Sequence, residues 1–215
     1  MLRFGMRVIG GKFRSRSLLA PTGWHTRPTS DRLRETLMNV LENGAVNRID
    51  GAKLLDLFAG TGAVGIEALS RGAQSVTFVE RNAKTMAIQE ANCARMGLGR
   101  EAVSIRAAAV NWLRREAALS DANPAFDLVF LDPPWDDAAA YAHTLGLLGA
   151  DAASLLTADA WVIVEHRRKT SLTERFGCLA RWRVLEQGDA ALSFYRRSAS
   201  DLDSKMNTET NPESS

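Results

Sequence analysis

The chain has 215 residues, of which 46% are hydrophobic and 24% are charged. This composition is typical of a globular protein with a sizeable core, and it excludes a disordered chain, a collagen-like chain and a small disulfide scaffold. The formal net charge of +2 averages three unlike segments. Residues 1–35 carry eight basic and two acidic residues (net +6), residues 36–199 carry 18 and 19 (net −1), and residues 200–215 carry one and four (net −3). A basic segment on a nearly neutral body suggests a polyanionic partner.

The cysteines, histidines and apolar runs exclude further classes of protein. Cys93 and Cys178 stand far apart, which fits a reducing compartment and neither a disulfide framework nor a thiolate metal site. The three histidines show no metal-ligand spacing, so a zinc enzyme is not expected. The N-terminus lacks the apolar core of a signal peptide, and no uncharged apolar run approaches about 18 residues. We therefore expect a cytoplasmic protein without membrane contact.

The N-terminal segment predicts a hairpin followed by a helix. In residues 6–19, short β-type runs flank Gly10-Gly11, which is a turn signal. Residues 27–31 can cap a helix, and Arg32 and Arg34 lie off its apolar face. That face carries Leu33, Leu37, Val40 and Leu41. The segment is too small to be a stable domain, so we expect it to dock on the body of the protein or on a partner.

From residue 51 onward, strand and helix patterns alternate. Strands are predicted at 53–58, 75–79, 103–105, 127–131 and 161–165, and helices at 63–71, 83–96 and 137–149. Two further β runs, 181–185 and 191–196, are joined through Gly188-Asp189 and predict an antiparallel hairpin. The pattern indicates an α/β fold with a mostly parallel, doubly wound sheet. Residues 198–215 are polar and acidic with little apolar content, so this tail is predicted to be disordered.

A glycine-rich turn follows the first strand of this region. Residues Gly60–Gly65 read G-x-G-x-x-G between a strand and a helix, and Glu80 ends the next strand 20 residues after Gly60. A carboxylate at that place can accept hydrogen bonds from both hydroxyls of a ribose. The turn alone is a weak signal, but with Glu80 it predicts an adenosine-containing ligand across the carboxyl ends of the strands.

Asp56 separates two ligand classes. A dinucleotide brings a pyrophosphate to such a loop, and an acid at the loop entrance would repel it. S-adenosylmethionine (SAM) carries an ammonium group and a sulfonium instead, so the acid favours SAM. Taken singly, Asp56 could be a turn-capping carboxylate and Glu80 a solvated charge at a strand end; together with the loop they favour a ligand site.

The segment Asp132-Pro133-Pro134-Trp135 directly follows a predicted strand. Two prolines restrict the backbone, so the carbonyls of Asp132 and Pro133 can form a rigid pair of acceptors beside the carboxylate. Such acceptors suit a planar exocyclic amine, because they favour a localised nitrogen lone pair and help to remove the proton after methyl transfer. Trp135 offers a face for base stacking, worth about 1–3 kcal/mol per base. The plainer interpretation is an ordinary turn with a core tryptophan.

These residues carry a family resemblance. DLFAGTG, Glu80 and DPPW resemble the class I SAM-dependent methyltransferases that use an acid-Pro-Pro-aromatic motif to methylate amines. The segments RVIGGKFRSRSL, RPTSDRLRETLMNVL, DLFAGTGAVGIEALSRGA and FVERN are similar to the bacterial 16S rRNA guanine-966 N2-methyltransferase family. The resemblance covers roughly residues 6–197.

The resemblance implies a seven-stranded Rossmann-like sheet with a terminal antiparallel hairpin. It implies an enzyme that needs no metal and transfers a methyl group from SAM to the N2 amine of a guanine in 16S rRNA, on an assembled or assembling small subunit, leaving S-adenosylhomocysteine (SAH). We expect the enzyme to be a monomer. Residues 1–45 would form a basic RNA-binding extension, residues 46–197 the methyltransferase domain and residues 198–215 the tail.

The resemblance and the local chemistry also assign residues to the predicted site. The expected catalytic residues are Asp132, Pro133, Pro134 and Trp135. The expected cofactor-binding residues are Asp56, Phe58, Ala59, Gly60, Gly62, Glu80 and Arg81. The residues expected to meet RNA phosphates are Arg7, Lys12, Arg14, Arg16, Arg27, Arg32 and Arg34. The cluster Arg167-Arg168-Lys169 fits an RNA contact and a solvated loop about equally.

The sequence departs from the family pattern in two places. Trp135 stands where tyrosine is usual, so stacking is kept but a hydroxyl is lost. Residues 106–109 read Arg-Ala-Ala-Ala where a polar or acidic residue often contacts adenine, so backbone N–H groups and apolar packing are expected there instead.

Three other functions fit parts of the sequence. An amino-methyltransferase acting on DNA adenine or protein glutamine would share the acid-Pro-Pro-aromatic motif, although the chain has no room for a separate DNA-recognition domain. A dinucleotide oxidoreductase is disfavoured by Asp56. A non-catalytic RNA-binding module would leave the motif at 132–135 without a purpose.

Overall fold

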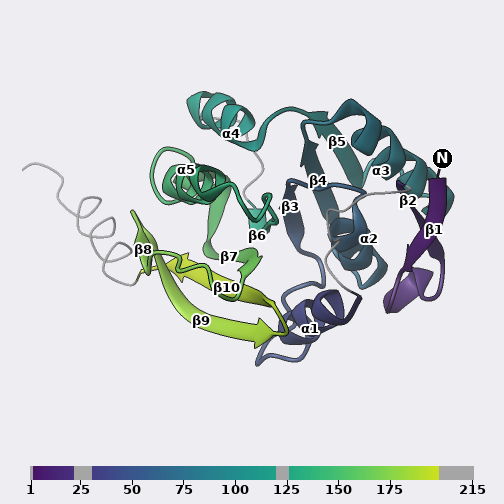
Figure 1. The fold of residues 1–215 in the computed structure, drawn as a ribbon, viewed down its shortest axis with the longest axis horizontal. Helices are drawn as coiled ribbons and strands as arrows, with labels where there is room; N and C mark the ends of the chain where they lie inside the picture. The colour runs from purple at the N-terminus through teal and green to yellow at the C-terminus, as the bar shows by residue number, and fades with distance from the viewer. Residues whose placement is uncertain (1, 22–30, 120–125, 199–215) are drawn as a thin grey trace, which may run out of the picture.

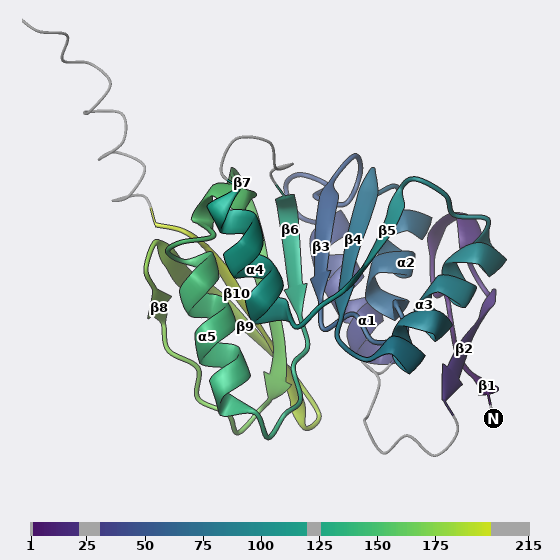
Figure 2. The same ribbon diagram turned by 90° about the horizontal axis from the view of Figure 1, so that it is seen from above.

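The computed structural model describes residues 2–21, 31–119 and 126–198 (Figure 1). A central sheet carries helices on both faces, and a separate two-stranded hairpin lies at one end beside α3 (Figure 2). The predicted α/β architecture is therefore confirmed. Among the described residues, no helix combines the length and apolar character needed to cross a bilayer.

The central sheet has the strand order β5-β4-β3-β6-β7-β10-β9-β8. Its parallel strands are β3 (Lys53–Leu57), β4 (Ser75–Glu80), β5 (Ala102–Arg106), β6 (Phe126–Leu131) and β7 (Leu156–Arg167). The antiparallel part consists of β8 (Arg175–Phe176), β9 (Leu179–Gln187) and β10 (Ala190–Arg197). The predicted terminal hairpin is thus confirmed as β9 and β10. The predicted number of strands is exceeded by one, because the two-residue β8 is too short to leave a β pattern in the sequence.

The helices cover the two faces of the sheet unequally. They are α1 (Asp31–Glu42), α2 (Ala63–Ser70), α3 (Ala83–Met96), α4 (Ala109–Ala118) and α5 (Ala138–Leu148), with short 3-10 turns η1 (Gly11–Phe13) and η2 (Ala153–Leu155). One buried apolar cluster joins one sheet face to α1, α2, α3 and the hairpin, and a second joins the other face to α4 and α5. Helix α4 has no counterpart among the predicted elements.

The N-terminal hairpin docks on the body of the protein, which is one of the two predicted alternatives. It pairs β1 (Leu2–Arg7) with β2 (Ser17–Pro21), and Phe13 and Leu18 enter the same core cluster as α1 and α2. Its turn approaches the end of α2 so closely that a Cβ on Gly11 would lie 1.9 Å from the carbonyl oxygen of Ser70. Since Gly11 also has a φ of +71°, glycine is needed there for both conformation and space.

The glycine-rich turn sets α2 tightly against the sheet. Gly62, with a φ of +80°, leads into α2. A Cβ on Gly65 would lie 2.3 Å from Cε1 of Phe78 on β4. The absence of side chains at these positions lets the helix start directly behind the carboxyl ends of β3 and β4.

Candidate functional site

The parallel register brings four predicted segments to one edge of the sheet. Leu57 pairs with both Val79 and Leu131, and Leu131 pairs with Val164. The residues that follow these partners are therefore level with one another, at the carboxyl ends of β3, β4 and β6 and beside them on β7, which continues to Arg167. They are Phe58, Glu80, Asp132 and Glu165. Acidic groups thus line the edge where open α/β sheets bind their ligands.

The turn after β3 contains backbone of unusual conformation. Phe58 has a φ of +63°, and it shares this left-handed conformation with Gly60 at +57° and Gly62 at +80°. For a non-glycine residue this conformation costs about 1–3 kcal/mol and is concentrated at functional sites. Ala59 fixes the turn by donating its N–H to the carbonyl of Val79 at 3.1 Å. Next to Gly60, the space is open, since a Cβ there would meet only the carbonyl oxygen of Phe58, at 3.9 Å.

The carboxylate of Glu80 joins two loops. One oxygen accepts the N–H of Gly60 at 3.0 Å, and the other accepts the N–H of Asn82 at 2.7 Å. Glu80 is therefore more than a solvated charge at a strand end. A carboxylate offers about four acceptor sites, so two remain for ligand hydroxyls. Its neighbour Arg81 is exposed.

Asp56 lies deeper than the other acids, with only 2% of its surface exposed. Its carboxylate accepts the N–H of Gly65 at 3.1 Å, so it caps the first turn of α2. Burial raises the pKa of Asp56 from 3.8 to about 7, the bond from Gly65 opposes this shift, and the charge of Glu80 adds to it. A cation placed beside this carboxyl would be stabilised, because it would favour the ionised form.

The Asp132-Pro133-Pro134-Trp135 segment forms the turn between β6 and α5. Asp132 is partly buried, and its pKa is raised well above the usual range by burial, then by the charges of Glu165 and Asp56. The predicted outward pair of carbonyl acceptors is only partly available. The hydroxyl of Tyr141, buried on α5, donates to the carbonyl of Pro133 at 3.4 Å, so one lone pair points inward.

Three further residues border this turn, and two of them, Glu165 and Tyr141, were not predicted as part of the site. Glu165 is 3% exposed and lies on β7 two residues before its end. It is the last residue of the predicted strand 161–165, as Glu80 is of β4, which is the signal that could have found it. Tyr141 has a pKa raised by burial and then by Asp132 and Glu165. The guanidinium of Arg167 lies 5.3 Å from the ring centre of Trp135 and 3.3 Å from the carboxylate of Asp136. Arg167, in the cluster that fitted two interpretations, therefore lies beside the Pro-Pro turn.

In the segment expected to contact adenine, one backbone N–H already has a partner within the sheet. The N–H of Ala107 already donates to the carbonyl of Glu80 at 3.2 Å. Ala108 has extended backbone and precedes the first turn of α4. Among residues 106–109, the N–H of Ala107 is thus engaged in holding β5 against β4.

Most of the basic residues predicted to meet RNA phosphates are exposed. They are Arg7, Lys12, Arg14, Arg16 and Arg32. Arg27 and residues 199–215 of the predicted tail lie outside the described residues.

The phosphate contact predicted for Arg34 is wrong, because its side chain is fully buried. It donates to the carbonyl of Arg7 at 2.7 Å and to Asp31 at 2.9 Å, and its Nε lies 3.5 Å from Glu67. Arg34 fails the surface prediction because the hairpin and α2 close over it. It connects the hairpin to α1 and α2 instead.

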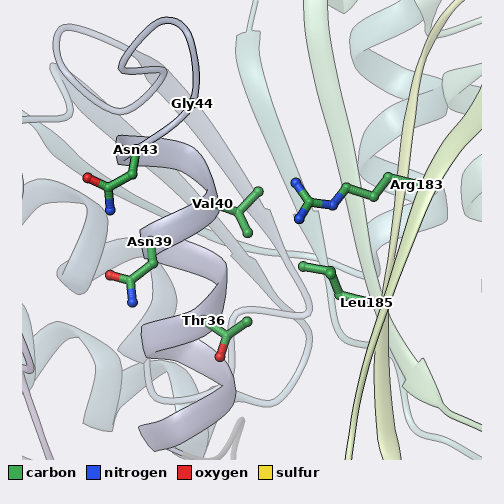
Figure 3. A pocket seen from close by; sticks show the side chains of 7 residues that line it. All are labelled: Thr36, Asn39, Val40, Asn43, Gly44, Arg183 and Leu185. Carbon is green, nitrogen blue, oxygen red and sulfur yellow. The ribbon is translucent and has the colours of Figure 1, made fainter.

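A groove of about 500 Å³ lies between α1 and β9 (Figure 3). It is lined by Thr36, Asn39, Val40, Asn43, Gly44, Arg183 and Leu185. None of these residues belongs to the glycine loop or to the Pro-Pro turn.

Within the described ranges, no group of three or more histidine, cysteine or acidic side chains is arranged to hold a metal ion.

Comparison with known proteins gives consistent matches over most of the chain. The family model described as Conserved hypothetical protein 95 matches residues 6–196. The putative rRNA methyltransferase YlbH of Bacillus subtilis (strain 168) is 35% identical over 192 residues, which cover 89% of this chain and 99% of that protein. Ribosomal RNA small subunit methyltransferase D of Escherichia coli (strain K12) is 37% identical over 130 residues, 60% of each chain.

A solved structure agrees with these matches. The putative methyltransferase yhhF from Escherichia coli superposes with a TM-score of 0.74 at 32% identity, covering 90% of this chain and 98% of that chain. The Rossmann-like methyltransferase fold and the family resemblance inferred from the motifs are confirmed. Because the family model spans most of the sequence, the chain belongs to the family described as Conserved hypothetical protein 95.

Proposed function

We propose that the protein transfers a methyl group from SAM to an exocyclic amine of ribosomal RNA. The target we assign is the N2 amine of guanine-966 in 16S rRNA, on an assembled or assembling small subunit in the cytoplasm. The observation that carries the proposal is the common level of Glu80 and Asp132 at the sheet edge, on either side of the strained turn after β3. Relatives named as rRNA methyltransferases support the class of substrate.

SAM would bind across the turn after β3. Glu80 would accept hydrogen bonds from the ribose hydroxyls while it holds the N–H of Gly60. Asp56, with its raised pKa, would ionise beside the ammonium group of SAM. The remaining cofactor contacts would come from Phe58, Ala59, Gly62 and Arg81. Orientation of the sulfonium methyl toward the acceptor would supply much of the rate gain.

The acceptor base would be unstacked from RNA and held beside the Pro-Pro turn. Trp135 would stack on it, and Asp132 with the free lone pair of the Pro133 carbonyl would accept the amine hydrogens. SAM would supply the methyl group: the N2 lone pair would bond to the methyl carbon as the carbon–sulfur bond breaks, and SAH would leave. The proton lost from N2 would pass to the carboxylate of Asp132, whose raised pKa suits it as an acceptor.

The N-terminal residues 1–45 would form the RNA-binding extension of the methyltransferase domain, residues 46–197. The exposed side chains Arg7, Lys12, Arg14, Arg16 and Arg32 would meet RNA phosphates and set the register without reading base identity. Arg167, close to Trp135, would meet the phosphate of the unstacked nucleotide.

The deciding experiment is mass spectrometry of ribosomal RNA from cells that lack the protein. We expect one 2-methylguanine to disappear from the small-subunit RNA and to return with the wild-type gene but not with Asp132→Ala. Unchanged rRNA, with methyl groups missing from DNA or from a protein glutamine instead, would overturn the assignment. A thermal shift with NAD and none with SAM would favour an oxidoreductase.

A further inference from the structure

Asn92 on α3 contacts both the N-terminal hairpin and the glycine loop. Its side chain is fully buried. The amide oxygen accepts the N–H of Leu19 on β2 at 2.8 Å. The amide nitrogen donates to the carbonyl of Leu19 at 3.1 Å and to the carbonyl of Thr61 at 3.0 Å. Thr61 stands between Gly60 and Gly62, so one side chain bonds to both structures.

These bonds use both N–H groups of the amide and its oxygen. Asn92 exchanges two hydrogen bonds with Leu19 of β2, as a residue on a neighbouring strand would. The second N–H then reaches the loop. Because this position is buried, removal of the amide would leave the carbonyl of Thr61 without this partner, and water could not easily replace the lost hydrogen bond.

A second set of contacts ties the hairpin to α2, which begins at the same loop. Glu67 accepts the N–H groups of Ile9 at 2.8 Å and Gly10 at 2.7 Å. Ser70 accepts the N–H of Phe13 at 2.8 Å and donates to the carbonyl of Gly10 at 2.6 Å. These contacts hold the hairpin turn at the far end of α2, whereas Asn92 acts on the loop itself.

We infer that Asn92 couples cofactor binding at the glycine loop to the docking of the basic hairpin, so that cofactor and RNA each raise the affinity of the other. The inference rests on the proposed function, because it takes the hairpin as an RNA-binding element. Asn92 is a positioning residue in this scheme. A cofactor that orders the loop fixes the carbonyl of Thr61, and through Asn92 it restrains β2, which follows Lys12, Arg14 and Arg16 in the chain. RNA that orders the hairpin restrains the carbonyl of Thr61 through Asn92 and so raises the affinity for the cofactor, as thermodynamic linkage requires.

The test compares Asn92→Ala with Ser70→Ala, which weakens hairpin docking without touching Thr61. The probes are SAH and purified small subunits from cells that lack the protein. In the wild type, we expect saturating SAH to tighten binding to the subunits by about fivefold or more. Asn92→Ala should bring this ratio to about one. Ser70→Ala should weaken binding to the subunits but keep the ratio. An unchanged ratio in Asn92→Ala overturns the coupling, and so does a wild-type ratio of one when hairpin variants bind the subunits more weakly than the wild type.

Hydrogen exchange provides a second readout that needs no RNA. SAH added to the wild-type protein should slow exchange of the amides of β2, and Asn92→Ala should lose this protection. If SAH protects β2 but neither SAH nor a hairpin variant alters subunit binding, the coupling stands and the proposed RNA role fails. If SAH binds by calorimetry and leaves β2 exchange unchanged, the coupling fails and the proposed function stands. Absence of SAH binding overturns both.

Discussion

Glu80 accepts the backbone N–H of Gly60 at 3.0 Å, so the acid that ends β4 holds the loop that follows β3. The same carboxylate accepts the N–H of Asn82, which begins the next connection. One side chain therefore shapes the predicted cofactor loop, and in the proposed function it would also contact the ligand. A substitution of Glu80 should therefore alter both the loop conformation and the proposed ligand contact.

Glu80→Ala should weaken SAM binding by about 10- to 100-fold, because hydrogen bonds to a charged group are worth about 1.5–3 kcal/mol. The dissociation constant is measured by calorimetry. Glu90→Ala, an exposed acid on α3, is the control and should bind SAM as the wild type does. An unchanged dissociation constant in Glu80→Ala would count against the ribose assignment.

Asp132→Asn should lower the turnover number for methyl transfer by about 10²- to 10⁴-fold, the usual loss when a proton acceptor is removed. SAM affinity should stay within about threefold, because Asp132 is assigned to the acceptor base. The rate is followed by transfer of a labelled methyl group to small subunits. Asp151→Asn changes an exposed acid after α5 and should keep the wild-type turnover. Normal turnover in Asp132→Asn would remove its catalytic role.

Asp56 makes stability depend on pH in a defined window. Its pKa of about 7 in the folded protein lies above its ordinary value of 3.8, so folding takes up a proton between these values. The contribution of Asp56 is full below about pH 4 and is lost as the pH rises through 7, at up to about 1.4 kcal/mol per pH unit.

Asp56→Asn keeps a carbonyl acceptor for Gly65 and removes the titrating group. Urea unfolding between pH 5 and pH 8 should therefore show the free energy of unfolding falling more steeply in the wild type than in Asp56→Asn. Asp50→Asn, an exposed carboxyl, should follow the wild type. Parallel curves for wild type and Asp56→Asn would contradict the raised pKa.

Arg14→Gln with Arg16→Gln should weaken binding to small subunits and reduce the slope of log affinity against log salt by about two units, since each lost phosphate contact removes nearly one. The matched control replaces Arg100 and Arg114, which are exposed outside the hairpin. Equal slopes in the two double variants would show that the hairpin does not read phosphates.

Gly65→Ala should destabilise the fold by about 1–3 kcal/mol, because its Cβ would lie 2.3 Å from Phe78 and 2.7 Å from Val76 in a packed layer. Gly146→Ala on α5 meets nothing within 4 Å and should stabilise the helix by about 0.5–1 kcal/mol. Urea unfolding of the two variants gives the comparison. Equal effects would mean that α2 has room to move away from β4.

Local signals in the sequence predicted most elements. Helix α3 spans the predicted residues 83–96, because Asn82 caps it through the N–H groups of Lys84 and Thr85 and Gly97 ends it with a φ of +73°. Such caps act within a few residues, so the sequence carries them directly. Helix α4 has no side-chain cap, and β8 has two residues, so both lack a comparable signal.

Burial of charged residues could not be predicted in the same way. Arg34 looks like a surface cation on a helical wheel, yet Glu67, 33 positions later in the chain, receives it inside the molecule. Whether an arginine faces solvent depends on what packs over it, and here the cover is the N-terminal hairpin. The pattern of charges along the helix contains no information about that cover.

The sequence by itself determined the chemistry of this protein's predicted site: the glycine turn, the acid that ends β4, the acid that follows β6, and the Pro-Pro turn. These features depend on local backbone geometry and residue type, which neighbours in the chain largely set. Only the tertiary structure decided that Glu165 stands level with Asp132, and that Asn92 joins the hairpin to Thr61. Both relationships depend on how distant segments align across the sheet and pack against it, which no short stretch of sequence specifies.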